Sequence, residues 1–142
     1  MIGMFKHILV PTDFTDKSYR ALDIAVELAL QHRGKVTLLH VIETLEGMER
    51  EELGAFYEKL RARAKKEMRK MIGQYRNQAV IGDKKIVLGK RAGEIVTMAR
   101  DLEVDLIVLS SHPLDPANPN QDWATISYKV AILAPCPVLM IK

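Results

Sequence analysis

The sequence predicts an α/β fold, in which an open parallel sheet of five strands is covered by helices. Two patterns carry this prediction: short apolar runs recur along the chain, and segments whose apolar residues repeat every three or four positions separate them. A length of 142 residues with 48% hydrophobic residues suits a single sizeable core. We therefore expect residues 1–142 to form one domain.

The predicted strands are short runs that lack strict alternation of apolar and polar residues. They cover residues 7–10, 35–41, 86–88, 105–109 and 137–141, and Pro11 ends the first of them. Continuous apolar runs are typical of strands whose two faces are both buried, as in a parallel sheet. Helical segments between such strands indicate βαβ units with right-handed crossovers.

Three helices are predicted from the spacing of their apolar residues. They cover residues 15–33, 92–102 and 123–133. Thr15 or Ser18 can cap the first helix and Gly34 can end it, while Pro135 stops the last one.

A longer, charged connection follows the second strand, at residues 45–76. It carries one narrow apolar stripe, which predicts an amphipathic helix. Residues 58–70 contain seven Lys or Arg and two Glu, a local balance of +5. Such a basic face can meet an anion, a membrane surface or nucleic acid. We favour the simpler interpretation, in which it is the solvated outer face of a packed helix.

Composition excludes several classes of protein. No apolar run approaches the roughly 20 residues that span a bilayer, and residues 1–10 lack the apolar core of a signal peptide, so we expect no membrane span. The net charge of +3 is too small to indicate nucleic acid as a partner. Cys136 is the one cysteine and is expected to be a small packed residue. The lack of a disulfide framework suits the reducing cytoplasm.

Ligands of open parallel sheets bind beyond the carboxyl ends of the strands, so the residues after each strand are candidates for a site. Pro11, Thr12 and Asp13 follow the first strand, and Val41 ends the second. The Asp13 carboxylate could accept a hydrogen bond from a ribose hydroxyl or an adenine amine. It could equally cap a helix or satisfy loop N–H groups, and its position leaves both roles open.

Two further polar segments are candidates for holding phosphate. Ser110, Ser111 and His112 follow the fourth strand and could offer hydroxyl and backbone donors, or form an ordinary turn before a proline-rich loop. Thr125 and Ser127 lie at the start of the last helix, where free N–H groups and the helix dipole favour phosphate. Hydroxyls at such positions are more frequently simple N-caps.

Several stronger motifs are absent from the sequence. It contains no P-loop pattern, no glycine-rich dinucleotide fingerprint after the first strand and no nucleophile elbow of a serine hydrolase. The four histidines have no metal-ligand spacing. His40 is expected to be a partly buried, satisfied side chain of the second strand. We therefore predict no catalytic residue and no metal site.

The chain resembles the universal stress proteins (UspA-like) over its whole length. The matching segments are residues 6–14 (KHILVPTDF), 35–41 (KVTLLHV), 92–99, 104–112 (VDLIVLSSH) and 134–141 (APCPVLMI), in the family's order and spacing. The resemblance implies a Rossmann-like sheet of the adenine-nucleotide alpha hydrolase type, with strand order 3-2-1-4-5. It also implies a homodimer in which the edge strand at 137–141 pairs with its two-fold mate, which would protect an apolar edge.

The family's glycine pattern for binding ATP is not retained in this chain. Members that bind ATP carry the pattern G-x2-G-x9-G-[ST] after the fourth strand. Here Ser110, Pro113 and Ala124 stand at the three glycine positions, and the second spacer has ten residues. Glycines let a backbone wrap phosphates closely, so the usual grip on a triphosphate is not expected.

Other parts of the family's nucleotide site are retained. Asp13 matches the residue at the adenosine end, and Val41 matches the position whose backbone lies by adenine. The segment near the phosphates is matched by Thr125, Ile126 and Ser127. ATP, or a compact ligand such as AMP, is thus the cofactor that the resemblance suggests.

Three functions follow from these patterns. The first is a cytoplasmic, homodimeric stress or regulatory module without enzyme activity, which binds an adenine nucleotide weakly or in an altered mode. The second is a slow ATP hydrolase or nucleotide-transfer enzyme on the same fold, although no general base or pair of metal-binding carboxylates lies beside the phosphate segment. The third is a nucleotide-free adaptor that docks a protein partner through its long basic helix.

Overall fold

The computed structural model describes residues 3–44, 50–111, 117 and 125–142. Its elements alternate as the sequence predicts. They are β1 (His7–Pro11), α1 (Asp16–His32), β2 (Lys35–Glu43), α2 (Arg50–Ile72), a short 3₁₀ turn (Gln78–Val80), β3 (Ile81–Gly89), α3 (Arg91–Asp101), β4 (Leu106–Ser110), α4 (Ile126–Leu133) and β5 (Val138–Ile141). The proline-rich segment after β4 and Trp123, which was expected in the last helix, lie outside the described residues.

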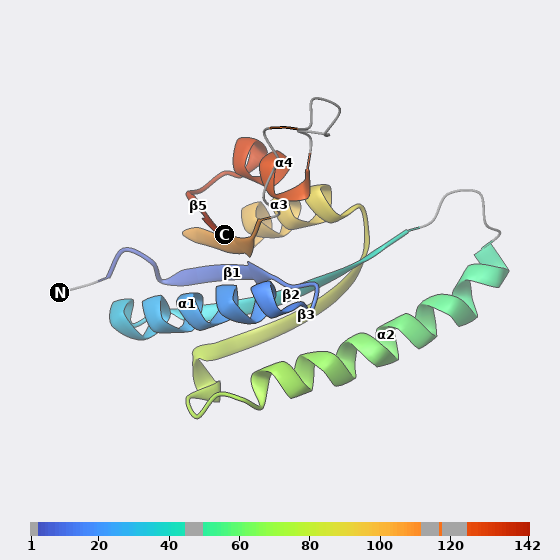
Figure 1. Ribbon diagram of the computed structural model, residues 1–142, viewed down its shortest axis with the longest axis horizontal. Helices are drawn as coiled ribbons and strands as arrows, with labels where there is room; N and C mark the ends of the chain where they lie inside the picture. Colours follow the sequence, from blue (N-terminus) through green and yellow to red (C-terminus); the bar gives the residue numbers. More distant parts are fainter. Residues whose placement is uncertain (1–2, 45–49, 112–116, 118–124) are drawn as a thin grey trace.

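The sheet has five parallel strands in the order β3-β2-β1-β4-β5, which confirms the predicted fold class and strand order. Helices cover both of its faces. The buried side chains of α1 and α2 pack with one face of the sheet, and those of α3 and α4 pack with the other. Figure 1 shows α1 lying over the sheet and α2 alongside its β3 edge, with α3 and α4 on the opposite side.

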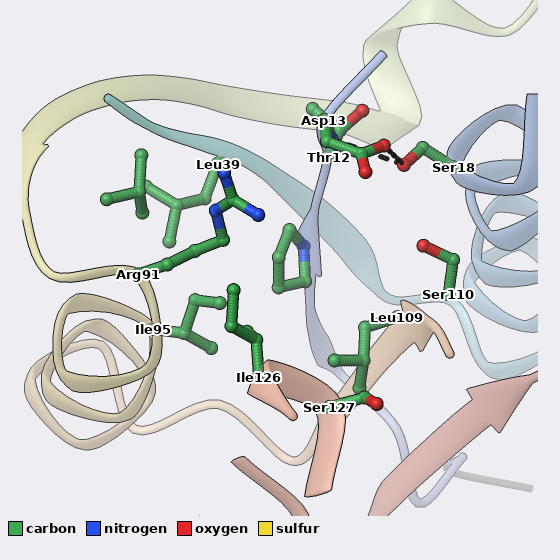
Figure 2. A pocket seen from close by; sticks show the side chains of 12 residues that line it. Thr12, Asp13, Ser18, Leu39, Arg91, Ile95, Leu109, Ser110, Ile126 and Ser127 are labelled. Atoms are coloured by element: carbon green, nitrogen blue, oxygen red, sulfur yellow. Dashed lines mark hydrogen bonds between the residues drawn. The ribbon is translucent and has the colours of Figure 1, made fainter. Parts of the chain in front are cut away.

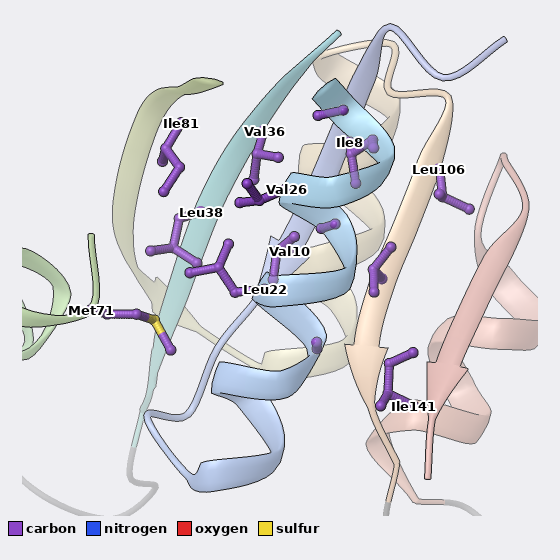
Figure 3. Packing of buried hydrophobic residues seen from close by; sticks show 14 of the residues in the cluster. Ile8, Val10, Leu22, Val26, Val36, Leu38, Met71, Ile81, Leu106 and Ile141 are labelled. Carbon is purple, nitrogen blue, oxygen red and sulfur yellow. The ribbon is translucent and has the colours of Figure 1, made fainter. Parts of the chain in front are cut away.

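The larger core cluster lies beneath α1. Leu22 and Val26 of this helix lie against Val10, Val36 and Leu38 of the strands (Figure 3). All five are at most 7% exposed. Burying an aliphatic side chain of this kind stabilises the fold by about 1.5–3 kcal/mol, so this layer holds β1 and β2 firmly in register.

Strand β3 is longer than the sequence suggested. It extends over Ile81–Gly89, whereas the apolar run covered only residues 86–88. The added residues include Lys84 and Lys85, which lie outside that apolar run. They form a strand because β3 is an edge strand, where pairing with β2 satisfies the backbone and charged side chains can face water.

Helix α1 begins as expected but ends differently. The Thr15 side chain accepts a hydrogen bond from the N–H of Ser18 and so caps the helix. Arg33, not Gly34, adopts the left-handed conformation at its end. Gly34 is required for another reason, because a Cβ there would collide with the carbonyl groups of Phe5 and Lys6. The glycine lets the chain pass close to the segment before β1.

Candidate functional site

A cavity lies where β1, β2 and β4 end and where α1, α3 and α4 begin, at the carboxyl edge of the sheet. Its volume is about 80 Å³. Apolar side chains and polar groups from these six elements surround it (Figure 2). The lining residues are Pro11, Thr12, Asp13, Ser18, Leu39, Val41, Arg91, Ile95, Leu109, Ser110, Ile126 and Ser127.

A second cavity of about 400 Å³ adjoins the first on the side of α2. Asp13, Val41 and Arg91 line both cavities, so the two meet at these side chains. The remaining lining comes from Phe14, His40, Ile42 and Glu43, and from Leu60, Arg63, Ala64 and Glu67 of α2. We call the cavity of about 80 Å³ the inner cavity and refer to the two cavities together as the Asp13 cleft.

The Asp13 carboxylate is held on one of its two oxygens. Oδ1 accepts hydrogen bonds from the Thr15 hydroxyl and the Ser18 hydroxyl, both at 2.5 Å, and from the Thr15 N–H at 3.1 Å. Within the described part of the chain, no other residue donates a hydrogen bond to Oδ2. The loop-satisfying role and a ligand-accepting role are therefore compatible, because they use different oxygens of the same side chain.

The protonation state of Asp13 follows from these contacts. Burial alone would raise the pKa of the carboxyl, but hydrogen bonds from Ser18 and Thr15 outweigh it and hold the pKa below its ordinary value. The group is consequently a carboxylate at neutral pH, which accepts hydrogen bonds and donates none.

The loop that carries Asp13 is held in an unusual conformation. Phe14 has φ 65°, in the left-handed region that side chains other than glycine rarely adopt. The Thr12 hydroxyl accepts a hydrogen bond from the Phe14 N–H at 3.0 Å, and the Phe14 ring packs on His40 with the ring centroids 4.5 Å apart. Backbone strain of this kind persists only where surrounding contacts enforce it.

His40 supports the same loop from β2. Its Nδ1 lies 2.7 Å from the carbonyl oxygen of Thr12. A carbonyl can only accept, so Nδ1 carries a proton and donates. Burial lowers the pKa of His40, and the nearby Arg91 lowers it further, which keeps the ring neutral at pH 7. His40 is thus the partly buried, satisfied histidine that the sequence predicts.

The backbone of Val41 is directed toward the cleft. The Thr12 N–H donates to the Leu39 carbonyl at 2.8 Å, so the peptide groups of Leu39 face β1. Peptide groups two residues apart on a strand point to the same side, and β1 ends at Pro11, opposite Leu39. The N–H and C=O of Val41 therefore face the space beyond the end of β1.

Positive potential gathers at the other side of the cleft. Ile126 and Ser127 are the first two residues of α4, whose N-terminus carries free N–H groups and the positive end of the helix dipole. Arg91, the first residue of α3, extends its guanidinium into the cavity (Figure 2). This arrangement suits an anionic group beside an otherwise largely apolar pocket.

Seven of the ten sequence-predicted site residues line the inner cavity. They are Pro11, Thr12, Asp13, Val41, Ser110, Ile126 and Ser127. Thr125 lines neither cavity; it caps α4 by accepting a hydrogen bond from the N–H of Tyr128. Ser111 is buried and donates to the Ile141 carbonyl, which ties β4 to β5. His112 lies outside the described residues.

Sequence reasoning missed five residues that line the inner cavity. They are Ser18, Leu39, Arg91, Ile95 and Leu109. Ser18 was considered only as a helix cap, and Leu39, Ile95 and Leu109 were read as core. Arg91 comes just after the third strand, separated from it by Lys90. A cation at this position reaches the carboxyl edge of the sheet, so its place in the sequence could have identified Arg91.

The described residues offer no metal site or reactive thiol. No three His, Cys, Asp or Glu side chains among them gather closely enough to hold a metal ion. Burial and the charge of Asp105 raise the pKa of the Cys136 thiol, which therefore stays protonated and packs against the α3 and α4 side of the core. In the part of the chain that the structure describes, no helix is long and apolar enough to cross a membrane.

Known proteins of similar sequence and structure share this arrangement of elements. Universal stress protein YxiE of Bacillus subtilis (strain 168) is 30% identical over 149 residues, which span 98% of this chain and 100% of that protein. Universal stress protein UspA from Lactobacillus plantarum matches with a TM-score of 0.79 and 25% identity over 99% of both chains. The universal stress protein of Archaeoglobus fulgidus, solved in complex with dAMP, has the same fold with a TM-score of 0.71 and 19% identity, over 98% of this chain and 99% of that one.

The family model of the universal stress protein family matches residues 4–142. The match thus includes every strand of the sheet and both cavities of the Asp13 cleft. By this match, the relative from Bacillus subtilis and the shared fold, the chain belongs to the universal stress protein family.

Proposed function

We propose that this protein is a cytoplasmic regulatory module that binds an adenine mononucleotide in the Asp13 cleft and acts as a single-domain homodimer. One observation carries the nucleotide proposal: Asp13 presents an unsatisfied carboxylate oxygen, Oδ2, to a half-apolar cavity at the carboxyl edge of the sheet. The lone cysteine, with no partner for a disulfide, supports the cytoplasmic location.

The nucleoside would lie between Asp13 and Val41. Oδ2 can accept from a ribose hydroxyl or from the adenine amine, and the peptide groups of Val41 can pair with the edge of the base. Val41 and Ile42 line the larger cavity and supply apolar surface against which a purine can stack. A site built from apolar walls with a few converging polar groups is typical of small-molecule pockets.

The phosphate would lie at the start of α4. The N-terminus of this helix, the Ser127 and Ser110 hydroxyls and the Arg91 guanidinium all border the inner cavity. That cavity holds about 80 Å³, which suits one phosphate better than three. The residues at the family's glycine positions, Ser110, Pro113 and Ala124, also favour a monophosphate over a wrapped triphosphate.

Two solved relatives of the same fold support the choice of a mononucleotide. The protein from Archaeoglobus fulgidus was solved with dAMP. Another universal stress protein, at 18% identity and a TM-score of 0.68, was solved with cAMP. Both ligands are adenine nucleotides with a single phosphate group.

Calorimetric titration with AMP, ADP and ATP tests the proposal. We expect AMP to bind, and Asp13→Asn to weaken it about tenfold or more, because a lost hydrogen bond to a charged group is worth about 1.5–3 kcal/mol. Asp16→Asn is the matched control: it removes the same charge from an exposed residue outside both cavities. The proposal fails if no nucleotide gives heat, or if the two variants bind AMP equally.

Exposed apolar side chains at the β5 edge support the homodimer. β5 is an edge strand of the sheet. Ile132 and Leu133 of α4 are 63% and 62% exposed, and Leu139 of β5 is 38% exposed. Covering large exposed apolar side chains and an open strand edge with a second copy removes both from water.

Light scattering after size exclusion tests the dimer. The wild type at micromolar concentration should have twice the 16.1 kDa mass of one chain. Leu139→Lys should shift it to the monomer, whereas Leu30→Lys, an equivalent change at an exposed leucine on α1, should not. A monomeric wild type would contradict the proposal.

A further inference from the structure

A third cavity, a recess apart from the Asp13 cleft, lies between α2 and β3, at the edge of the sheet opposite β5. Its volume is about 210 Å³. Four cationic side chains and two apolar ones line it: Arg61, Lys65, Arg69 and Met68 of α2, and Lys84 and Ile86 of β3. We call it the basic recess. None of its lining residues lines the Asp13 cleft.

The helix and the strand each present their lining residues on one side. Arg61, Lys65 and Arg69 are spaced four residues apart, so they form one row along α2. On β3, Lys84 and Ile86 are two residues apart and face the same side of the strand. The recess is therefore a place where two elements direct positive charge toward each other, over the buried Met68.

The rest of the basic segment faces elsewhere. At 100° per residue, Lys59, Lys66 and Lys70 fall on the opposite side of α2, where they form the solvated outer face that the sequence predicts. Six of the seven cations thus divide into an outer group and a group directed at β3, while Arg63 lines the Asp13 cleft. The two groups can be compared experimentally.

None of the described residues that line the basic recess is acidic. The ion pair found among the described residues joins Lys85 to Asp83 at 3.4 Å, on strand positions that alternate with the lining residues Lys84 and Ile86. Arg61 is held in place by donating to the Ile86 carbonyl at 3.3 Å, and this acceptor carries no charge. Like charges four residues apart destabilise a helix. An anion bound here would therefore reduce the repulsion among Arg61, Lys65 and Arg69.

We propose that the basic recess binds a small anion carrying two or three linked phosphate groups. Arg and Lys are the side chains that recognise phosphate, and Arg does so with two parallel hydrogen bonds. Pockets for drug-sized ligands have volumes of roughly 300 Å³ or more, and the recess is smaller than that. It therefore suits a small anion without a large organic substituent. Four cations from two elements match several negative charges within a short span.

A concave site favours this anion over extended polyanions. A membrane surface or a nucleic-acid duplex contacts charges spread over a convex or flat face, which is how the outer lysines of α2 are arranged. The cations of the basic recess instead surround a hollow. A chain with a net charge of only +3 also lacks the broad positive field that such partners need.

Calorimetry with inorganic tripolyphosphate at low ionic strength tests the proposal. The double variant Lys65→Gln with Arg69→Gln should weaken binding about tenfold or more, since each removes a charged hydrogen-bond donor. The matched control, Lys59→Gln with Lys66→Gln, removes two charges from the outer side of the same helix and should change affinity less than about twofold. All four side chains are exposed, so both variants are expected to fold.

Backbone amide NMR shifts identify which site the anion occupies. Tripolyphosphate should shift amides of α2 and β3, and leave those around Asp13 unchanged. The proposal is overturned if wild type does not bind, if both double variants weaken binding equally, or if the shifted amides surround Asp13. Preferential sedimentation of the wild type with phosphatidylserine vesicles, without tripolyphosphate binding, would assign this face to membranes and overturn it as well.

Discussion

The Asp13 cleft and the basic recess differ in how their charged groups are satisfied. In the cleft, three donors hold one oxygen of Asp13, and a capped helix and a histidine support the loop around it. In the recess, four cations meet without an acidic partner among the lining residues. The cleft is organised by the protein before any ligand binds, whereas the recess requires an anion or salt to offset its charge.

Met71→Ala is expected to have the largest effect, because Met71 joins the two regions. Its side chain is fully buried on α2, the helix that carries the recess, and its sulfur lies 3.7 Å from the Thr12 hydroxyl in the cleft loop. We expect a loss of about 2–5 kcal/mol in the free energy of unfolding, measured with urea. Met4→Ala, at a side chain that is 74% exposed, should change it by less than about 0.5 kcal/mol. Equal effects would mean that Met71 does not anchor α2.

Ser18→Ala sharpens the comparison by removing one donor from Asp13. We expect it to lower the free energy of unfolding by about 1–2 kcal/mol at pH 7, because a half-buried carboxylate loses a hydrogen bond. Ser110→Ala is the control in the same cleft, since it makes no described bond to Asp13, and its effect should be smaller.

The pH dependence of that loss follows from the pKa of Asp13. The folded pKa lies below the ordinary value of 3.8, so the stabilisation is complete above that pH and disappears as the pH falls through the folded pKa. The difference in urea midpoint between wild type and Ser18→Ala should therefore be largest at pH 7 and smaller at pH 3, which lies below the ordinary pKa of 3.8. Persistence of the full difference at pH 3 would show that Ser18 acts independently of the carboxylate.

His40→Asn is expected to have a smaller, pH-dependent effect. The pKa of His40 is lowered in the folded protein, so stability is complete above the ordinary value of 6.5 and falls as the pH decreases through the folded pKa. An asparagine can still donate to the Thr12 carbonyl but does not titrate. The variant should lose less stability than wild type between pH 7 and pH 5. Some pH dependence of the free energy of unfolding should remain, because the pKa of His7 is also lowered in the folded protein. Identical pH profiles would contradict this.

Lys65→Gln should have the smallest effect and the opposite sign. It removes like-charge contacts with Arg61 and Arg69, one turn away on either side, and should raise the free energy of unfolding by about 0.5 kcal/mol at low ionic strength. The gain should shrink in high salt, which screens exposed charges. Lys59→Gln, with one such neighbour in Arg63, should gain less. Destabilisation by Lys65→Gln would show that the charge of Lys65 is already compensated.

Much of the fold could be predicted because its signals are local. Continuous apolar runs identified all five strands, and Thr15 was one of two candidates for the cap of α1. The same reasoning shortened β3, because Lys84 and Lys85 lie outside the apolar run and belong to the strand only through pairing with β2. It also expected Gly34 to end α1, whereas Arg33 adopts the left-handed conformation there and Gly34 is required by the close approach of Phe5 and Lys6.

By itself the sequence determined the layers of the molecule and the positions at which ligands can bind, because strand and helix periodicity and the loop after each parallel strand are properties of neighbouring residues. Only the tertiary structure decided which oxygen of Asp13 stays open, that Ser18 and Arg91 join it, and that half of a basic helix faces β3. Those outcomes depend on distances between residues far apart in the chain, and packing of the helices on the sheet sets such distances.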